Sequence, residues 1–382
     1  MSGVSSLLEG KRICVCAGSG GVGKTTTSAA VALGMAAQGA KVAVVTIDPA
    51  RRLANALGLE QLDNEPHRVE ETRLSVGGLR MRGELWAMML DPKRTFDELI
   101  DRLAPDPARA QEIKRNRVYG ELSTAVSGSQ EFTAISKLYE LDREHDFDLL
   151  VLDTPPSRNA LDFLEAPQRL NSFLEGRALK ALVMPTGLGM RVLGRSASPL
   201  LGALRRVTGI DLMADLATFF QLLAGMTADF TERAAQVEQL LRAPTTAFVL
   251  VTSAQQEPTE EAIWFHRTLR AGGLPFAGVV VNRVHHDLLS GRNPGDVATA
   301  LAGLLPDELA ERVAANFLDY HVLAARDERN IARLAAALAG EPMLLVPHLD
   351  EDIHDLEGLL RMHRYLFASA AEREKMIADL VA

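Results

Sequence analysis

The stretch Gly18-Ser19-Gly20-Gly21-Val22-Gly23-Lys24-Thr25-Thr26 decides the fold of this chain. Its four glycines allow successive backbone N–H groups to turn inward around an anion, where a Cβ atom would crowd the phosphates. An apolar run at residues 12–17 precedes it, and a segment rich in Ala, Thr, Leu and Met follows over residues 24–38. This order predicts a strand, a phosphate-binding loop and a helix.

Each residue of the loop has a defined chemical role. Lys24 can reach the β and γ phosphates as a point charge, and the Thr25 hydroxyl can bind Mg²⁺. The positive end of the following helix points at the anion. The residues that we expect to bind nucleotide are Gly20, Gly21, Val22, Gly23, Lys24, Thr25, Thr26 and, from a later strand, Asn282.

The composition bounds the class of protein. The chain has 382 residues, 47% of them hydrophobic, which is enough for a substantial core. Its net charge of −9 argues against a general nucleic-acid binder, so we expect no nucleic-acid partner. The amino-terminal segment lacks the charged and apolar regions of a signal peptide, and no uncharged apolar run reaches about 18 residues. We expect a cytoplasmic protein.

The two cysteines, Cys14 and Cys16, lie two residues apart on the strand that leads into the loop. Alternate residues of a strand point to the same face, so we expect both thiols to be buried together. Two such thiols provide neither a disulfide framework nor a metal cage, and we expect no zinc.

Short apolar runs alternate with helical stretches along the whole chain. Continuous apolar runs between helices indicate strands buried on both faces, and hence an α/β fold with a doubly wound, mainly parallel sheet. We expect residues 1–382 to form one domain of the phosphate-loop NTPase type, with helical insertions at about 93–145 and 163–241 forming a subdomain. The expected strands after the first are residues 41–47, 85–90, 147–152, 246–252, 276–281 and 343–346.

Polar side chains follow three of these strands. Asp48 and Asp153 come directly after apolar runs, where side chains reach the carboxyl edge of the sheet and the phosphates lie. An Asp there can hold a Mg²⁺-bound water or orient the attacking water, although a lone strand-end Asp as often caps a turn or helix. Asn282 occupies the same kind of position, and its amide could read a purine edge or belong to a turn.

The loop, together with residues 46–50, 153–157, 163–164 and 280–282, resembles the family of the arsenite-pump ATPase ArsA and the tail-anchored-protein targeting ATPases. The resemblance implies an ATPase that uses ATP and Mg²⁺. It places Asp48 in a first switch that positions water. It places Asp153 in a second switch near Mg²⁺, which we expect Asp153 to contact through a water molecule. It also assigns Lys24 to catalysis and Asn282 to adenine.

Three departures from the family pattern bear on partners. Ser19 stands where the family usually carries a signature lysine that reaches across a dimer, so a heterodimer with a lysine-bearing paralogue is favoured over a homodimer. The Cys-x-x-Cys pair of the eukaryotic targeting ATPases is absent. The thiolates that bind arsenite in the pump ATPase have no counterpart except Cys14 and Cys16, which disfavours an anion-efflux subunit.

The region 179–230 could bind a client polypeptide. Its apolar residues, methionines and glycines suit an adaptable apolar groove for a hydrophobic or membrane-protein client, and an ordinary helical core explains them equally well. A further alternative is a weakly catalytic or non-catalytic subunit that binds ATP as a structural ligand.

Overall fold

The computed structural model describes residues 3–48, 51–70, 78–117, 119, 129–154, 218–219, 221–223, 226–289, 296–302, 304–349 and 351–381. The chain divides into two compact units. The first comprises residues 1–89, 144–160 and 242–382, and the second comprises residues 90–143 and 161–241. The expectation of a single domain with a helical subdomain stays a prediction.

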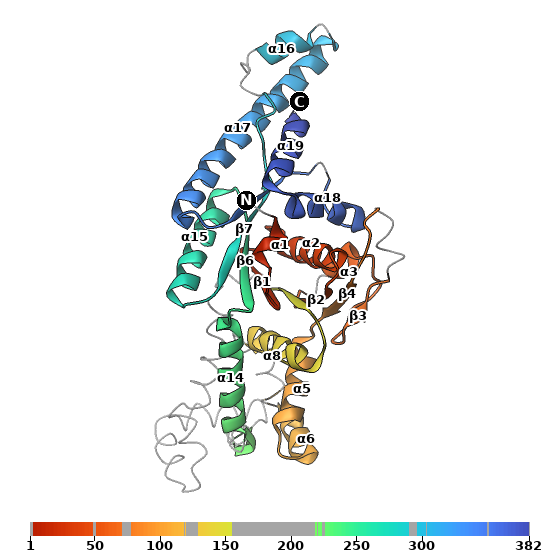
Figure 1. Cartoon of the computed structure of the whole chain (residues 1–382), viewed down its shortest axis with the longest axis vertical. Coiled ribbons are helices and arrows are strands. Elements are labelled where there is room, and N and C mark those ends of the chain that lie inside the picture. The colour runs from red at the N-terminus through yellow and green to blue at the C-terminus, as the bar shows by residue number, and fades with distance from the viewer. Residues whose placement is uncertain are drawn as a thin grey trace, which may run out of the picture. The chain divides into compact units, whose positions relative to one another are not determined.

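The first unit is built on one eight-stranded sheet with the order β3-β4-β2-β5-β1-β6-β7-β8. All pairings are parallel except that of β3 with β4 (Figure 1). This confirms the α/β class and the mainly parallel sheet. The strands are β1 (Ile13–Ala17), β2 (Lys41–Thr46), β3 (His67–Arg68), β4 (Glu84–Met89), β5 (Leu149–Asp153), β6 (Thr246–Ser253), β7 (Phe276–Val284) and β8 (Met343–Pro347).

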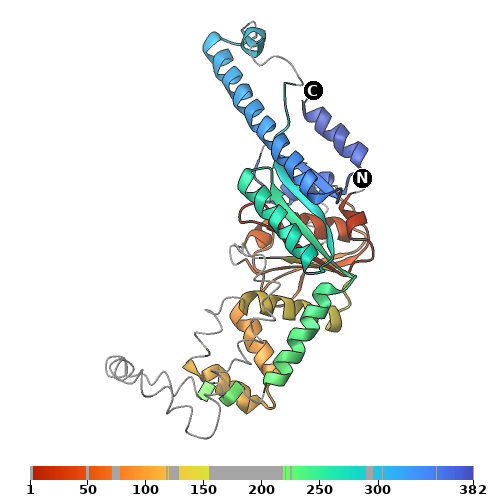
Figure 2. The same ribbon diagram turned by 90° about the vertical axis from the view of Figure 1, so that its left-hand side faces the viewer.

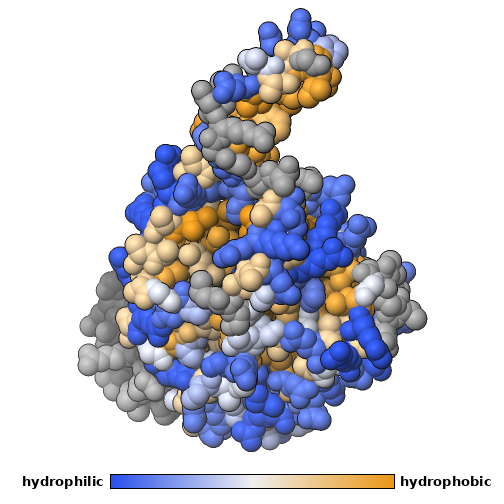
Figure 3. Space-filling model, turned by 45° about the horizontal axis from the view of Figure 1, so that its top comes forward, coloured by the Kyte–Doolittle hydropathy of each residue, from blue (hydrophilic) through white to orange (hydrophobic). Residues whose placement is uncertain are grey.

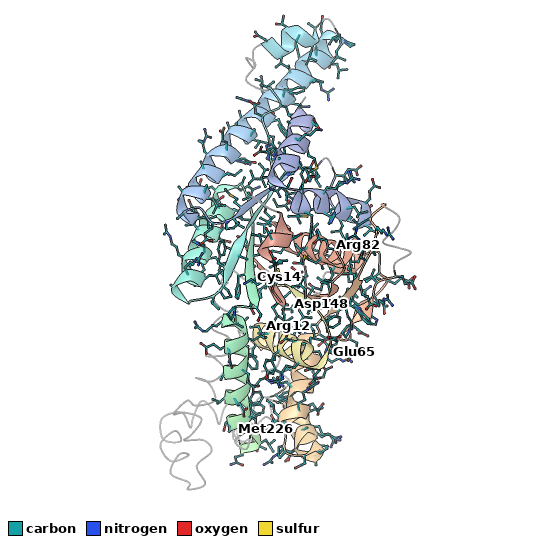
Figure 4. The ribbon with its side chains drawn as sticks, in the orientation of Figure 1. Arg12, Cys14, Glu65, Arg82, Asp148 and Met226 are labelled. Carbon is teal, nitrogen blue, oxygen red and sulfur yellow. The ribbon has the colours of Figure 1, made fainter. Side chains whose placement is uncertain are left out.

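The central strands are apolar because both of their faces are covered. Every residue of β1, β5 and β6 is buried. Cys14 and Cys16 of β1 point to one face, with their sulfur atoms 3.9 Å apart, as expected from their spacing. Figure 4 places Cys14 within the sheet, and Arg12 and Asp148 precede β1 and β5 at the end of the sheet opposite the loop.

One face of the sheet carries α2 (Lys24–Ala37), which packs on β1, β2, β4 and β5. Gly34 of α2 lets α18 (Leu356–Phe367) approach closely, since a Cβ atom there would lie 2.2 Å from the ring of Phe367. The Asp355 side chain accepts the Gly358 N–H and begins α18. The short helices α1 (Val4–Leu7) and α3 (Arg52–Ala56) lie beside α18, and α19 (Ala370–Val381) follows it.

The opposite face carries α15 (Gln256–Ala271), which packs on β6 and β7 (Figure 2). The 32-residue helix α17 (Asp307–Leu338) packs on α15 through its carboxyl-terminal half. Its amino-terminal half extends beyond the sheet together with α16 (Asp296–Leu301) (Figures 1 and 2). The helix α17 therefore forms, together with α16, a helical hairpin that projects beyond the edge of the sheet.

The second unit is helical where it is described. Asp91 and Asp106 cap α5 (Pro92–Leu103) and α6 (Pro107–Arg115) by accepting the N–H groups of Arg94 and Arg109, and a proline opens each helix. Two longer helices complete the described part, α8 (Ser129–Glu144) and α14 (Thr227–Arg242).

The large apolar side chains at the described end of the 179–230 region are buried. Phe219, Leu223, Met226 and Phe230 belong to the apolar core of the second unit, together with side chains of α5 and α6. For these residues, ordinary core packing is the correct interpretation. Residues 179–217, on which the groove prediction mainly depends, lie outside the described residues.

Candidate functional site

A cavity of about 420 Å³ opens at the carboxyl ends of the strands of the first unit. The loop after β1 forms one of its walls, as is usual for ligand sites at such a sheet edge. The other walls come from the segment after β2, from Thr154 after β5, from the end of β7 and from residues at and after the end of β8. Of the residues predicted from the sequence, the cavity is lined by Gly21, Gly23, Lys24, Thr25, Thr26, Asp48 and Asn282.

The loop needs glycine for two different reasons. Gly21 and Gly23 have φ angles of 78° and 94°, in the left-handed region that side chains disfavour. Gly18 has a positive φ of 153° and is also required by close packing, because a Cβ atom there would lie 2.0 Å from the carbonyl oxygen of Val251 in β6. The neighbouring strand thus fixes the start of the loop.

Gly18→Ala is expected to lower the free energy of unfolding by about 2 kcal/mol or more, because the methyl group meets backbone that cannot rotate away. Urea unfolding measures the change. Gly10→Ala is the control for a positive φ without a close contact: its φ is 69°, against 153° for Gly18, and nothing lies within 4 Å of the added Cβ atom. A Gly18→Ala protein no less stable than the Gly10→Ala protein would contradict the contact with Val251.

Lys24 begins α2 and is buried, with 6% of its surface exposed. Its ammonium group donates to the carbonyl oxygen of Ser19 at 2.8 Å, which holds the side chain along the inside of the loop. Burial lowers the pKa of Lys24, and the carboxylates of Asp153 and Asp48 partly offset that effect. A desolvated cation at this place interacts strongly with an incoming phosphate.

Asp153, at the end of β5, is held by two hydroxyl groups. Its Oδ2 atom accepts hydrogen bonds from Thr25 and Thr46, each at 2.7 Å. Its Oδ1 atom is buried and has no hydrogen-bond partner in the described structure. Burial raises the pKa of Asp153 to about 6, against the opposing effects of the two hydroxyl groups and of Lys24.

This arrangement fits Mg²⁺. The donors are hydroxyl and carboxylate oxygens, which hard cations prefer, and the unpartnered Oδ1 atom of Asp153 lacks the positive partner that a buried carboxylate needs. Thr25 and, through water, Asp153 would hold the ion. In the part of the chain that the structure describes, no group of three or more His, Cys, Asp and Glu side chains could hold a metal ion by itself.

Asp48 lies at the cavity edge just after β2. Its backbone N–H donates to the Thr46 hydroxyl at 3.1 Å, and its carboxylate lies 3.6 Å from the guanidinium of Arg52 in α3. Thr46 thus contacts both strand-end aspartates. The chain continues through residues 49 and 50, which lie outside the described residues.

Asn282 packs directly on the loop. Its amide nitrogen donates to the carbonyl oxygen of Val22 at 3.0 Å, and a Cβ atom on Gly23 would lie 2.4 Å from that nitrogen. The next residue, Arg283, has a φ of 58° and lies 3.6 Å from Asp352 across the cavity. The structure therefore brings Asn282 to the nucleotide loop, and its proposed contact with adenine stays a prediction.

Sequence reasoning missed several residues of this site. Thr46 precedes the predicted Asp48 by two positions, and a hydroxyl at the last residue of a buried strand was a usable signal. Residues 347–349 and 351–354, at and after the end of β8, line the cavity, as the rule for strand ends would have indicated. No local signal in the sequence indicates Glu261, which accepts a hydrogen bond from the Ser19 hydroxyl although 242 residues separate them.

Among the described helices, none is both long and apolar enough to cross a membrane.

Comparison with known proteins agrees with this geometry. The model of a family described as anion-transporting ATPase matches residues 11–293. The putative arsenical pump-driving ATPase 1 of Aquifex aeolicus is 23% identical over 363 residues, which cover 93% of this chain and 78% of that protein. ATPase GET3 of Malassezia globosa is 26% identical over 269 residues, or 70% of this chain and 71% of that protein. ATPase GET3 of Mycosarcoma maydis is 26% identical over 221 residues, or 56% of this chain and 58% of that protein.

The family match covers most of the chain and includes the phosphate loop, both strand-end aspartates and Asn282. This chain therefore belongs to the ArsA family of anion-transporting ATPases.

Proposed function

We propose that the cavity beside the loop after β1 binds ATP with Mg²⁺, and that ATP is hydrolysed there to ADP and phosphate. The observation that carries this assignment is the buried Asp153 carboxylate, held at Oδ2 by Thr25 and Thr46 with its Oδ1 free, next to the buried ammonium group of Lys24. The site holds a cation and an unpartnered anionic oxygen at the end of one phosphate loop. Phosphoryl transfer requires this kind of positioning and charge stabilisation.

Each residue has one task in the proposed reaction. The backbone N–H groups of the loop and the Lys24 ammonium group bind the phosphates and stabilise the charge that develops on them. Asp48 orients the attacking water, and its link to Thr46 ties that position to Asp153. Bound Mg²⁺ would neutralise charge on the phosphate oxygens. Asn282 and residues 347–349 and 351–354 would contact the base.

The test is release of inorganic phosphate from Mg-ATP by the purified chain, with the Lys24→Met protein as the baseline. Release above that baseline supports hydrolysis at this site. Tight ATP binding without release above the baseline would favour the alternative of a non-catalytic ATP-binding subunit.

We also propose that the nucleotide site is completed by a second, lysine-bearing subunit. Ser19 supplies no charge at the tip of the loop, and its hydroxyl is bound to the exposed carboxylate of Glu261 on α15. The exposed Glu261 carboxylate beside the loop would interact favourably with a positively charged side chain of a partner subunit. A paralogue with lysine at the position of Ser19 fits this requirement, whereas a homodimer formed across the nucleotide site would place Ser19 and Glu261 at both sites.

Ser19→Lys is expected to pair with Glu261 within its own chain, so the single variant changes turnover little. Adding Glu261→Gln frees the new lysine, and we expect the double variant alone to hydrolyse ATP at least about 10-fold faster than the original chain, because one charge-assisted hydrogen bond contributes about 1.5 kcal/mol or more. Glu261→Gln by itself is the control. If the double variant is no faster than that control, the missing charge does not limit hydrolysis.

The task that hydrolysis drives is also a proposal. We propose a hydrophobic or membrane-protein client, which the apolar sequence of residues 179–217, with its methionines and glycines, would suit as well as it suits an ordinary helical core. An arsenite-type substrate fits this chain poorly, since its two thiols are buried inside the sheet. Their mutual hydrogen bond and burial raise the pKa of the Cys14 thiol, which opposes formation of the thiolate that a soft ion needs.

A further inference from the structure

Exposed apolar side chains gather on the hairpin that α16 and α17 form (residues 296–338). Of the five large apolar side chains that are exposed in the described part of the chain, four lie on this hairpin. Apolar surface is visible on it in Figure 3. Such clustering on a projecting element marks an interaction surface, whereas scattered exposed apolar residues do not. The four are Leu304, Leu309, Leu318 and Val322.

A regular stripe runs along the exposed face of α17. Its positions follow the alternating spacing of four and three residues that places side chains on one seam of a coiled coil. All of them are exposed except Ala325, which is half-buried. We call this stripe the α17 seam; it consists of Glu311, Ala315, Leu318, Val322, Ala325 and Arg329.

Among the described residues, none covers the two large apolar side chains of the seam. Ala310 and Ala314, which lie on the neighbouring face of α17 next to α16, are buried, while Leu318 and Val322 are 40% and 64% exposed. Two alanines flank the apolar pair, so a second helix could approach closely along the seam.

The two ends of the seam carry opposite charges. Glu311 and Arg329 are 18 positions apart, about 27 Å along a helix, and cannot reach each other within one chain. In the described structure neither forms an ion pair. By contrast, Arg326 and Arg333 of the same helix are bound to Asp327 and to Glu260 of α15.

We propose that the α17 seam pairs with the same seam of a second copy of this chain, with the two helices antiparallel. A two-fold axis level with residue 320 places Leu318 against the partner's Val322. The same axis places Ala315 against the partner's Ala325 and Glu311 against the partner's Arg329. Every contact then occurs twice, as an isologous interface requires.

The charges at the two ends of the seam favour antiparallel helices and a second copy of this chain as the partner. A parallel pair would place Glu311 against its own copy and Arg329 against its own copy, which is unfavourable, whereas the antiparallel pair joins opposite charges at both ends. A seam that carries both members of this pair is complementary to itself, so a second copy fits it. The seam has only two large apolar residues, so we expect a dissociation constant in the micromolar range, as for small interfaces.

The first test is sedimentation equilibrium of the full chain from about 1 to about 100 μM, the range that a micromolar constant requires. We expect a monomer–dimer equilibrium. The double variant Leu318→Glu/Val322→Glu should weaken dimerisation by 100-fold or more, which corresponds to about 3 kcal/mol. Leu309→Glu, on the same helix but outside the seam, is the control and should dimerise like the original chain. A chain that stays monomeric, or a dimer that survives the double variant, overturns the proposal.

Charge reversal tests the register. Glu311→Arg and Arg329→Glu should each weaken the dimer, and the protein that carries both changes should dimerise like the original. Failure of the double reversal to restore pairing overturns the antiparallel arrangement. In a second assay, Ala315→Cys and Ala325→Cys proteins should form a disulfide-linked dimer when mixed and oxidised, whereas a parallel pair would instead link Ala315→Cys to itself. The seam lies outside the cavity lining, so these results do not depend on ATP hydrolysis.

Discussion

Lys24→Met is expected to lower ATP turnover by about 100-fold or more, which is the usual loss when one preorganised charge contact to a transition state is removed. The methionine keeps the apolar stem of the buried side chain and removes only the ammonium group. Steady-state phosphate release at saturating Mg-ATP measures the loss. Lys375→Met, at an exposed position of α19, is the control and should keep full activity. Equal turnover in the two variants would show that the reaction occurs elsewhere.

The same variant should not be less stable than the original protein. Burial lowers the pKa of Lys24 in the folded state, so the folded protein binds fewer protons than the unfolded chain between that lowered pKa and 10.5. Below the lowered pKa, Lys24 is charged in the folded protein and the full cost of its desolvation applies. The free energy of unfolding therefore rises as pH increases from the lowered pKa to 10.5. Removing the charge at pH 7.5 therefore removes a cost. Thermal unfolding of Lys24→Met distinguishes this loss of chemistry from loss of fold.

Asp153→Asn is expected to abolish ATP turnover and to change how stability depends on pH. The folded-state pKa of about 6 exceeds the value of 3.8 for an unperturbed Asp. Between these values the folded protein holds a proton that the unfolded chain has released, so the free energy of unfolding falls as pH rises. The total fall from this group is about 3 kcal/mol, at about 1.4 kcal/mol per pKa unit.

In the Asp153→Asn protein, this group no longer lowers the free energy of unfolding as pH rises. Measured by urea unfolding without nucleotide, the free energy of unfolding of the variant relative to the original should rise by about 2 kcal/mol from pH 4 to pH 7. Burial lowers the pKa of His266, His286 and His363, which acts in the opposite direction but equally in both proteins. Thr46→Val is a useful companion, because loss of one hydrogen bond to the carboxylate should extend the fall to higher pH. Parallel pH profiles for the original and Asp153→Asn would rule out a raised pKa.

Local patterns in the sequence were sufficient for most of the first unit. The apolar runs predicted the seven parallel strands to within a few residues, because strands buried on both faces must be continuously apolar. The two-residue strand His67–Arg68 was missed, since it is exposed and too short to show a pattern. The two buried thiols of β1 were predicted correctly, because side-chain alternation is fixed by the strand itself.

In the candidate site too, some residues could be predicted from local sequence, whereas the contacts between them could not. Lys24, Thr25, Asp48, Asp153 and Asn282 could be chosen from the sequence because each directly follows a strand or a glycine loop. The hydroxyl of Thr46 could not be paired with Asp153, because that contact depends on β2 and β5 being neighbours. The contact of Ser19 with Glu261 likewise required the packing of α15 beside the loop.

By itself, the sequence determined that this chain has a phosphate loop on a mainly parallel sheet, since glycine geometry and apolar continuity are local properties. Only the tertiary structure decided that one oxygen of Asp153 is held by two threonines while the other lacks a partner, and that the α17 seam stays exposed. Both depend on which elements become neighbours. The Asp153 contacts arise from the packing of segments that lie more than a hundred residues apart in the sequence, and the seam stays exposed because no helix in the described part of the chain covers it.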